Sequence, residues 1–220
     1  MTHTSDCCVE DYQRRRLLAA TLAAGGLMLL PVPGWAGDIR ELAGDVSING
    51  RKVTKRSAVQ PGDTVVTGAA SRIAFVVGND AYLLKENARL ELEGGRGDRV
   101  ARALRLLTGG LLAVFGKSQT PRSLYTNTVT AGIRGTGIYM EAESKRTYFC
   151  TCYGAVEFEV AGSREKKLVM ASHHKGGWIN STAENGTHFG GPVMVGHGDN
   201  DLVALESLVG RKPPFMLPKG

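Results

Sequence analysis

Short strand-like runs separated by turn residues constrain the fold of this chain more than any other feature. Two such runs, 45–48 and 51–53, flank Asn49-Gly50, and an Asn-Gly pair in this setting is the strongest short-range signal for a β-hairpin. Further runs follow at 64–67, 72–77, 81–84 and 88–92. Short strands at intervals of roughly 8–12 residues, separated by Gly, Asn and Asp, are typical of all-β proteins. The sequence therefore predicts a mainly β fold, a sandwich, barrel or solenoid.

The segment 100–108 fits either a short helix or a strand, because its arginines and leucines suit both periodicities. We favour a strand, since Gly109-Gly110 and the apolar run 111–115 are typical of a turn and the return arm of a β pair. A second tight turn is expected within 133–137, where Gly135 and Gly137 can supply a positive φ.

The residues after Gly154 predict a small β region. Strands are expected at 156–160 and 167–170, and turns at Gly176-Gly177 and Asn185-Gly186.

One helix is expected, over 199–210. Asp199 or Asn200 can cap its start, Gly210 can cap its end, and Pro213-Pro214 prevents continuation. Its apolar face is expected to pack on its own domain; that face consists of Leu202, Val203, Leu205, Leu208 and Val209.

The first 36 residues have the pattern of an export signal. Arg14, Arg15 and Arg16 precede an apolar run over 17–30, and Gly34 and Ala36 suit a small-residue cleavage site. The run is shorter than a membrane span of about 20 residues. We therefore expect a periplasmic protein, cleaved near Ala36 and without a transmembrane span. We favour export by the twin-arginine route over the ordinary secretory route, because Arg14-Arg15-Arg16-Leu17-Leu18 fits a twin-arginine signal. An uncleaved signal that anchors the chain is the alternative.

The formal net charge of the chain is +6. The basic residues are scattered along the sequence rather than gathered in one stripe, which indicates a solvated, mildly cationic surface. Because the chain is also expected outside the cytoplasm, we exclude nucleic acid as a partner.

Cleavage near Ala36 removes Cys7 and Cys8, so the mature chain keeps only Cys150 and Cys152. Successive side chains of a strand point to opposite faces, so these two thiols are expected on the same face. They are poor partners for a disulfide, because Cα atoms two apart in a strand lie roughly 6.5–7 Å from each other.

Three histidines follow the thiols and can complete a metal site with them: His173, His174 and His197. Two Cys and two His suit Zn²⁺, and a soft site of this kind also suits a Cu or Fe ion. If the segment is extended, the adjacent histidines face opposite ways, so only one is expected to join the thiols. Asp199 or Glu206 can orient the imidazoles.

Two alternatives remain for the thiols: inert apolar groups in a core row with Tyr148, or a redox-active pair. The spacing matches no compact zinc-finger pattern. The sequence contains no phosphate loop, Gly-x-Ser-x-Gly elbow or His-Glu-x-x-His motif, so we do not expect an enzyme.

An ordered set of motifs resembles the FecR domain family. The set comprises 62–68, 83–90, 108–112 and Thr128-Val129-Thr130-Ala131-Gly132-Ile133-Arg134-Gly135-Thr136, followed by Gly137. The resemblance covers residues 38–160, and leaves 161–220 as a C-terminal extension. It implies a β-rich, solenoid-like periplasmic domain that signals or binds an unknown envelope protein or small ligand. Arg134, Gly135 and Thr136 are its motif residues; Arg134 either bonds to loop carbonyls or contacts a partner.

The best-known FecR proteins carry a cytoplasmic anti-sigma segment and a membrane span ahead of this domain. This sequence begins with the predicted signal instead, so we do not transfer sigma-factor regulation to it. Two functions are therefore expected as candidates: partner or ligand binding at the envelope, and metal binding or sensing through Cys150, Cys152 and the histidines.

Overall fold

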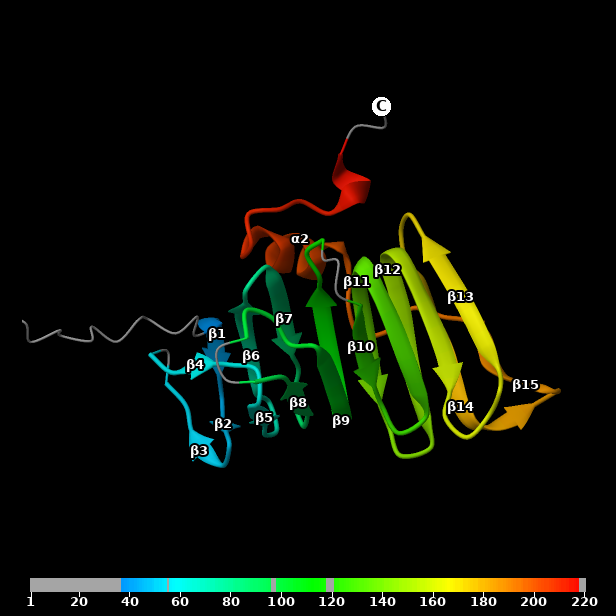
Figure 1. Ribbon diagram of the computed structural model, residues 1–220, viewed down its shortest axis with the longest axis horizontal. Coiled ribbons are helices and arrows are strands. Elements are labelled where there is room, and N and C mark those ends of the chain that lie inside the picture. The colour runs from blue at the N-terminus through cyan, green and yellow to red at the C-terminus, as the bar shows by residue number, and fades with distance from the viewer. Residues whose placement is uncertain (1–36, 55, 96–97, 118–120, 218–220) are drawn as a thin grey trace, which may run out of the picture. The chain divides into compact units, whose positions relative to one another are not determined.

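The computed structural model describes residues 37–217, except 55, 96–97 and 118–120 (Figure 1). Its strands belong to one fifteen-stranded sheet that is not closed, which confirms the prediction of a mainly β fold. The predicted export signal lies outside the described residues. No helix within the described ranges has both the length and the apolarity that crossing a membrane requires.

Eight short strands form the first part of the sheet. They are β1 (Gly37–Ala43), β2 (Val46–Ile48), β3 (Arg51–Lys52), β4 (Ala58–Val59), β5 (Thr64–Thr67), β6 (Arg72–Val77), β7 (Asp80–Leu84) and β8 (Arg89–Glu93). The β2–β3 hairpin turns at Asn49 and Gly50 as predicted, with φ values of 52° and 75°. These strands make two branches, β4–β1–β6–β7 and β3–β2–β5–β8.

Both branches join at β9 (Ala103–Val114), the strand that we favoured over a helix. Its residues 103–108 pair with β8, and its residues 111–114 pair with β7. The turn predicted at Gly109-Gly110 is therefore wrong: β9 runs through it. Gly109 has a φ of +74°, and a Cβ atom here would lie 2.6 Å from atoms of Ala88. The strand bends at this point because it passes from one branch to the other.

Six strands complete the sheet. They are β10 (Arg122–Tyr125), β11 (Val129–Ala142), β12 (Arg146–Val160), β13 (Lys166–Ala171), β14 (Lys175–Glu184) and β15 (Thr187–Pro192). β12 pairs with β14 through residues 146–151 and with β13 through 154–159. Asn185-Gly186 turns between β14 and β15 as predicted, but Gly176 and Gly177 lie inside β14, so the turn predicted there is wrong.

The predicted turn at 133–137 is also wrong, because β11 continues through these residues. The register of β11 against β12 shifts between Arg134 and Gly137, which marks a β-bulge. Gly135 has a φ of +55°. Gly137 lacks a positive φ; instead, a Cβ atom at this position would lie 2.5 Å from the Tyr153 ring.

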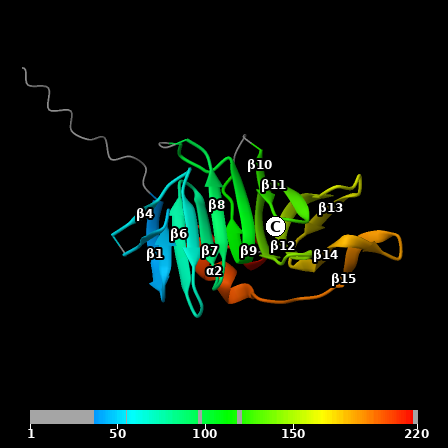
Figure 2. The same cartoon turned by 90° about the horizontal axis from the view of Figure 1, so that it is seen from below.

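Helix α2 (Asp199–Ser207) is followed by the short 3-10 helix η1 (Pro214–Met216). It is shorter than predicted, because hydrogen bonds from residues 208–210 reach back only three positions before the positive φ of Gly210. The N-cap is Gly198, not Asp199 or Asn200: the Gly198 N–H donates to the Asp201 carboxylate at 3.0 Å. Leu202 and Leu205 are buried as predicted, and α2 contacts β7 and β9 (Figure 2).

Two apolar clusters lie on opposite faces of the long strands. The inner core lies between the two branches and continues along β11 and β12; it includes Val65, Ile73, Phe75, Tyr82, Leu90, Leu106, Phe115, Phe149 and Phe158. The outer cluster lies on the other face, under α2 and the C-terminal segment; it consists of Ala81, Leu112, Val114, Tyr139, Tyr148, Cys150, Cys152, Tyr153, Leu202 and Leu205. Alternation along a strand places the thiols in the outer cluster, next to the inner-core side chain of Phe149.

Candidate metal centre

The strand β12 presents both thiols of the described chain on one face, as predicted. Cys150 and Cys152 are fully buried and unpaired, and their Sγ atoms lie 4.0 Å apart. Tyr148 belongs to the same row, whereas the intervening Phe149 packs into the inner core. The outer row therefore offers two sulfur atoms side by side, beneath segments that come from elsewhere in the sequence.

The segment 193–198 passes over this row because the Tyr148 hydroxyl holds it. This hydroxyl donates to the Val193 carbonyl at 3.0 Å and accepts from the Val195 N–H at 3.2 Å. Burial raises the pKa of Tyr148 to about 12, so its proton stays in place for the first of these bonds.

His197 is thereby placed over Cys152, with 3.3 Å between its Nε2 and the Cys152 Sγ. Its Nδ1 donates to the Val195 carbonyl at 2.9 Å, which leaves the lone pair on Nε2, directed at the thiol. The Tyr139 ring stacks on the imidazole, with centroids 4.5 Å apart. The hydrogen bond to Val195 and the stacking of Tyr139 therefore fix the orientation of the His197 ring.

His174 lies over Cys150, with 3.4 Å between its Nδ1 and the Cys150 Sγ. Its Nε2 lies 2.8 Å from Oδ1 of Asp199, the first residue of α2. A carboxylate on the far nitrogen is the arrangement that orients metal-binding imidazoles. The backbone N–H of His174 donates to the Cys152 carbonyl at 2.9 Å. This bond fixes the backbone of His174 against β12.

His173 stays outside the thiol group, as expected for one of two adjacent histidines. Its Nε2 lies 2.8 Å from the same Asp199 oxygen, and its ring packs on Phe215 at 4.5 Å. The segment is not extended, however: His174 has a φ of 31°. The two side chains diverge because of this bend, rather than by strand alternation.

Four ligand atoms, from Cys150, Cys152, His174 and His197, all lie within 4.8 Å of one another. In a tetrahedral zinc site the ligand atoms lie about 3.8 Å apart for two thiolates and about 3.5 Å apart for a thiolate and an imidazole nitrogen. The corresponding separations here are 4.0 Å, 3.4 Å and 3.3 Å. These three separations are close to tetrahedral values and the others do not exceed 4.8 Å, so the four atoms can surround one metal ion.

The two thiols differ in their affinity for protons. The pKa of Cys150 is lowered to about 5, first because the Cys152 S–H donates to it and then because His197 and His174 adjoin it, against the opposing effect of burial. Burial raises the pKa of Cys152. The surroundings thus favour the thiolate form at Cys150 and the thiol form at Cys152.

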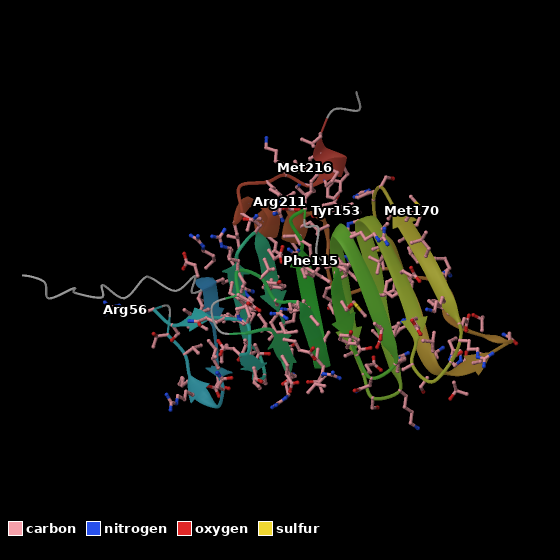
Figure 3. The ribbon with its side chains drawn as sticks, viewed as in Figure 1. Arg56, Phe115, Tyr153, Met170, Arg211 and Met216 are labelled. Atoms are coloured by element: carbon pink, nitrogen blue, oxygen red, sulfur yellow. The ribbon has the colours of Figure 1, made fainter. Side chains whose placement is uncertain are left out.

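Glu206, which we predicted as a partner for an imidazole, is used differently. It accepts hydrogen bonds from the Tyr153 hydroxyl and from Arg211 Nε, and Arg211 Nη1 donates to the Asn79 carbonyl at 2.6 Å. Figure 3 labels Tyr153 and Arg211 below η1. These bonds fasten α2 to the sheet beside the metal centre. Of the two predicted acidic partners, only Asp199 contacts the histidines.

Met194 also lies beside the thiols, although no sequence pattern singled it out. Its Sδ lies 4.0 Å from the Cys150 Sγ and 3.9 Å from the Tyr148 hydroxyl. The sequence signal that could have pointed to Met194 is its position three residues before His197.

The motif residues Arg134, Gly135 and Thr136 lie in the β11 bulge, apart from the thiol group. Arg134 is exposed, and its guanidinium forms no hydrogen bond or ion pair within the described part of the chain. Both readings of Arg134, a contact with loop carbonyls and a contact with a partner, therefore stay predictions. Thr136 is fully buried, and its Oγ1 has no hydrogen-bond partner there.

No family model matches this chain, and no curated protein matches it significantly. Two crystal structures of a protein from Parabacteroides distasonis ATCC 8503, described as a "putative anti-sigma factor", are similar to it at 11% sequence identity and a TM-score of 0.44. The similarity covers 54% of this chain and 55% of that chain. This chain thus spans about half the length of that protein, and a TM-score of this size does not establish a shared fold.

Proposed function

We propose that this protein binds one transition-metal ion through Cys150, Cys152, His174 and His197. One observation carries the proposal: four ligand atoms lie within 4.8 Å of one another, and three of their separations are close to those of a tetrahedral site. The oriented imidazoles strengthen it, because the far nitrogen of each ring already has an oxygen partner, Asp199 for one and the Val195 carbonyl for the other.

The protein holds or senses the ion rather than using it in catalysis. Four protein ligands fill a tetrahedral shell, whereas catalytic sites keep one position for water or substrate. The ligands also come from three separate segments: β12, the bend after β13, and the segment before α2. An ion held by all three fastens the C-terminal segment to the sheet, which is a structural response that a partner can detect.

Elemental analysis of the purified protein tests the proposal. The wild type should contain about one metal ion per chain, and Cys150→Ser/Cys152→Ser should contain almost none. Two histidine variants form a matched pair. His174→Asn should lose the ion, whereas His173→Asn should keep it, although both histidines contact Asp199. Equal metal content in the wild type and the double-cysteine variant would contradict the proposal.

The leader pattern over residues 1–36 and the FecR resemblance over 38–160 support an exported, envelope-located form of this metal protein. Arg15→Lys breaks both arginine pairs of Arg14-Arg15-Arg16, whereas Arg14→Lys leaves one pair intact. If export follows the twin-arginine route, only Arg15→Lys should retain the precursor in the cytoplasm when the fractions are blotted. Equal export of both variants would favour the ordinary secretory route, and a cytoplasmic wild type would contradict export altogether.

A further inference from the structure

We infer that Met194 is a third sulfur ligand of this centre and that the ion it takes is monovalent copper in preference to zinc. The inference rests on the proposed metal-binding function and adds the identity of the ion. The observation behind it is a thioether sulfur 4.0 Å from the Cys150 Sγ, the same separation as between the two thiol sulfurs.

Thioether sulfur distinguishes the two metals. Zinc sites in proteins use Cys, His and carboxylate ligands, whereas soft thiolate and thioether ligands together select Cu⁺. With Met194 included, the group offers three sulfur atoms and two imidazole nitrogens, from which a four-coordinate Cu⁺ would take the three sulfurs and one nitrogen. That ligand set is softer than a closed Cys₂His₂ zinc site requires.

The backbone holds Met194 in place from both sides. The Tyr148 hydroxyl bonds to the carbonyl of Val193 and to the N–H of Val195, the two neighbours of Met194 in the sequence. The same segment delivers His197 to Cys152. A single tyrosine thus positions the methionine and the histidine over the two thiols.

Core packing does not explain the position of this methionine. Met194 remains 48% exposed, although its sulfur lies against a buried thiol. It lines, together with His174, a cleft of about 540 Å³ that runs beside the centre. The side chain of Met194 is therefore accessible to solvent, although its sulfur contacts the buried thiol.

Competition titrations of the full mature chain test the inference. Cu⁺ is added anaerobically against a chromogenic Cu⁺ chelator, and Zn²⁺ is added separately against a zinc chelator. Met194→Leu keeps the volume and removes the sulfur; Met170→Leu, at an exposed methionine of β13, is the matched control. Loss of outer-shell partners costs about 10–100-fold in affinity, so loss of a ligand should weaken Cu⁺ binding at least about tenfold.

The expected result is a loss of Cu⁺ affinity in Met194→Leu with Zn²⁺ affinity unchanged, and no change for either ion in Met170→Leu. Equal Cu⁺ affinity in Met194→Leu and the wild type, with both ions lost in Cys150→Ser/Cys152→Ser, would overturn the copper assignment and leave the metal site standing. Absence of binding of either ion by the wild type would overturn the proposed function itself. Thermal unfolding of the metal-free variants shows whether each is folded.

Discussion

The inner core and the outer cluster share the strands β9, β11 and β12 but differ in chemistry. The inner core is almost entirely aliphatic and phenylalanine side chains. The outer cluster combines three tyrosines and two thiols, and histidines contact it from segments far away in the sequence. Alternate residues of the same strand thus contribute to the apolar core on one face and offer candidate metal ligands on the other.

This difference has a physical basis in what covers each face. The inner core is closed by the sheet itself, so strand pairing and apolar burial hold it together. The outer cluster is closed by α2 and the segment 193–198, which reach the sheet through side-chain hydrogen bonds at Tyr148, Tyr153 and Glu206. Changes to the inner core should therefore alter stability without altering metal binding, and changes to the outer cluster should alter metal binding with only a small effect on stability.

The largest effect is expected from Phe158→Ala. Phe158 is fully buried in the inner core and packs on Phe149 with ring centroids 4.5 Å apart. Truncation should lower the free energy of unfolding by about 3–5 kcal/mol, because it leaves a cavity. Denaturant unfolding measures the loss, and Leu168→Ala, at a side chain 61% exposed, should change little. The folded fraction of Phe158→Ala should bind metal normally; a matching loss of affinity would contradict the separation of the two faces.

A loss of about 3 kcal/mol is expected from Asp80→Asn, at a buried ion pair next to the inner core. The Asp80 carboxylate accepts from Arg122 at 2.7 Å and from the Gly116 N–H at 2.9 Å. Burial raises the pKa of Asp80, and the nearby charge of Arg122 only partly opposes this. Burying the charged carboxylate therefore costs free energy.

The penalty of Asp80→Asn should come mainly from leaving Arg122 buried without its counter-ion. Asp80→Asn/Arg122→Met should therefore be more stable than Asp80→Asn alone. Denaturant melts of both variants and the wild type measure this. A double variant less stable than the single one would show that the ion pair itself stabilises the fold.

Much of the fold could be predicted from local sequence. The Asn49-Gly50 hairpin and the strands around it follow from turn chemistry and alternation, which act over a few residues. The errors at 109–110, 133–137 and 176–177 share a cause. Glycine supplies a turn, a bulge or room for a neighbouring side chain equally well, and only the partner strand decides which.

The candidate site was predictable in composition but not in its arrangement. Alternation predicted that Cys150 and Cys152 lie together, and the structure places one of the two adjacent histidines, His174, beside them. Met194 and the bonds of the Tyr148 hydroxyl depend on how the segment 193–198 crosses β12, a contact over more than 40 residues that no periodicity encodes. Glu206 was assigned to the wrong partner for the same reason, since Tyr153 and Arg211 reach it only in the folded chain.

Metal loading should raise stability through the outer cluster alone. An ion that binds only the folded chain adds about 2.7 kcal/mol to the free energy of unfolding at a free concentration 100 times its Kd. The wild type and Phe158→Ala should gain this increment equally, and Cys150→Ser/Cys152→Ser should not gain it. Thermal unfolding with and without metal, and after removal by a chelator, measures it. An equal gain in the double-cysteine variant would place the ion elsewhere.

The smallest effect on stability is expected from Tyr148→Phe, which should cost about 1 kcal/mol in the metal-free protein. The ring remains to pack in the outer cluster, but the bonds to Val193 and Val195 are lost, so the segment carrying Met194 and His197 is no longer held over the thiols. Metal affinity should therefore fall about 10–100-fold, as for other partners that orient ligands. Tyr82→Phe is the matched control: it removes a hydroxyl bonded to Asp80 at 3.3 Å in the inner core. It should cost a similar amount of stability and leave metal affinity unchanged, so equal affinities in the two variants would show that Tyr148 does not position the metal ligands.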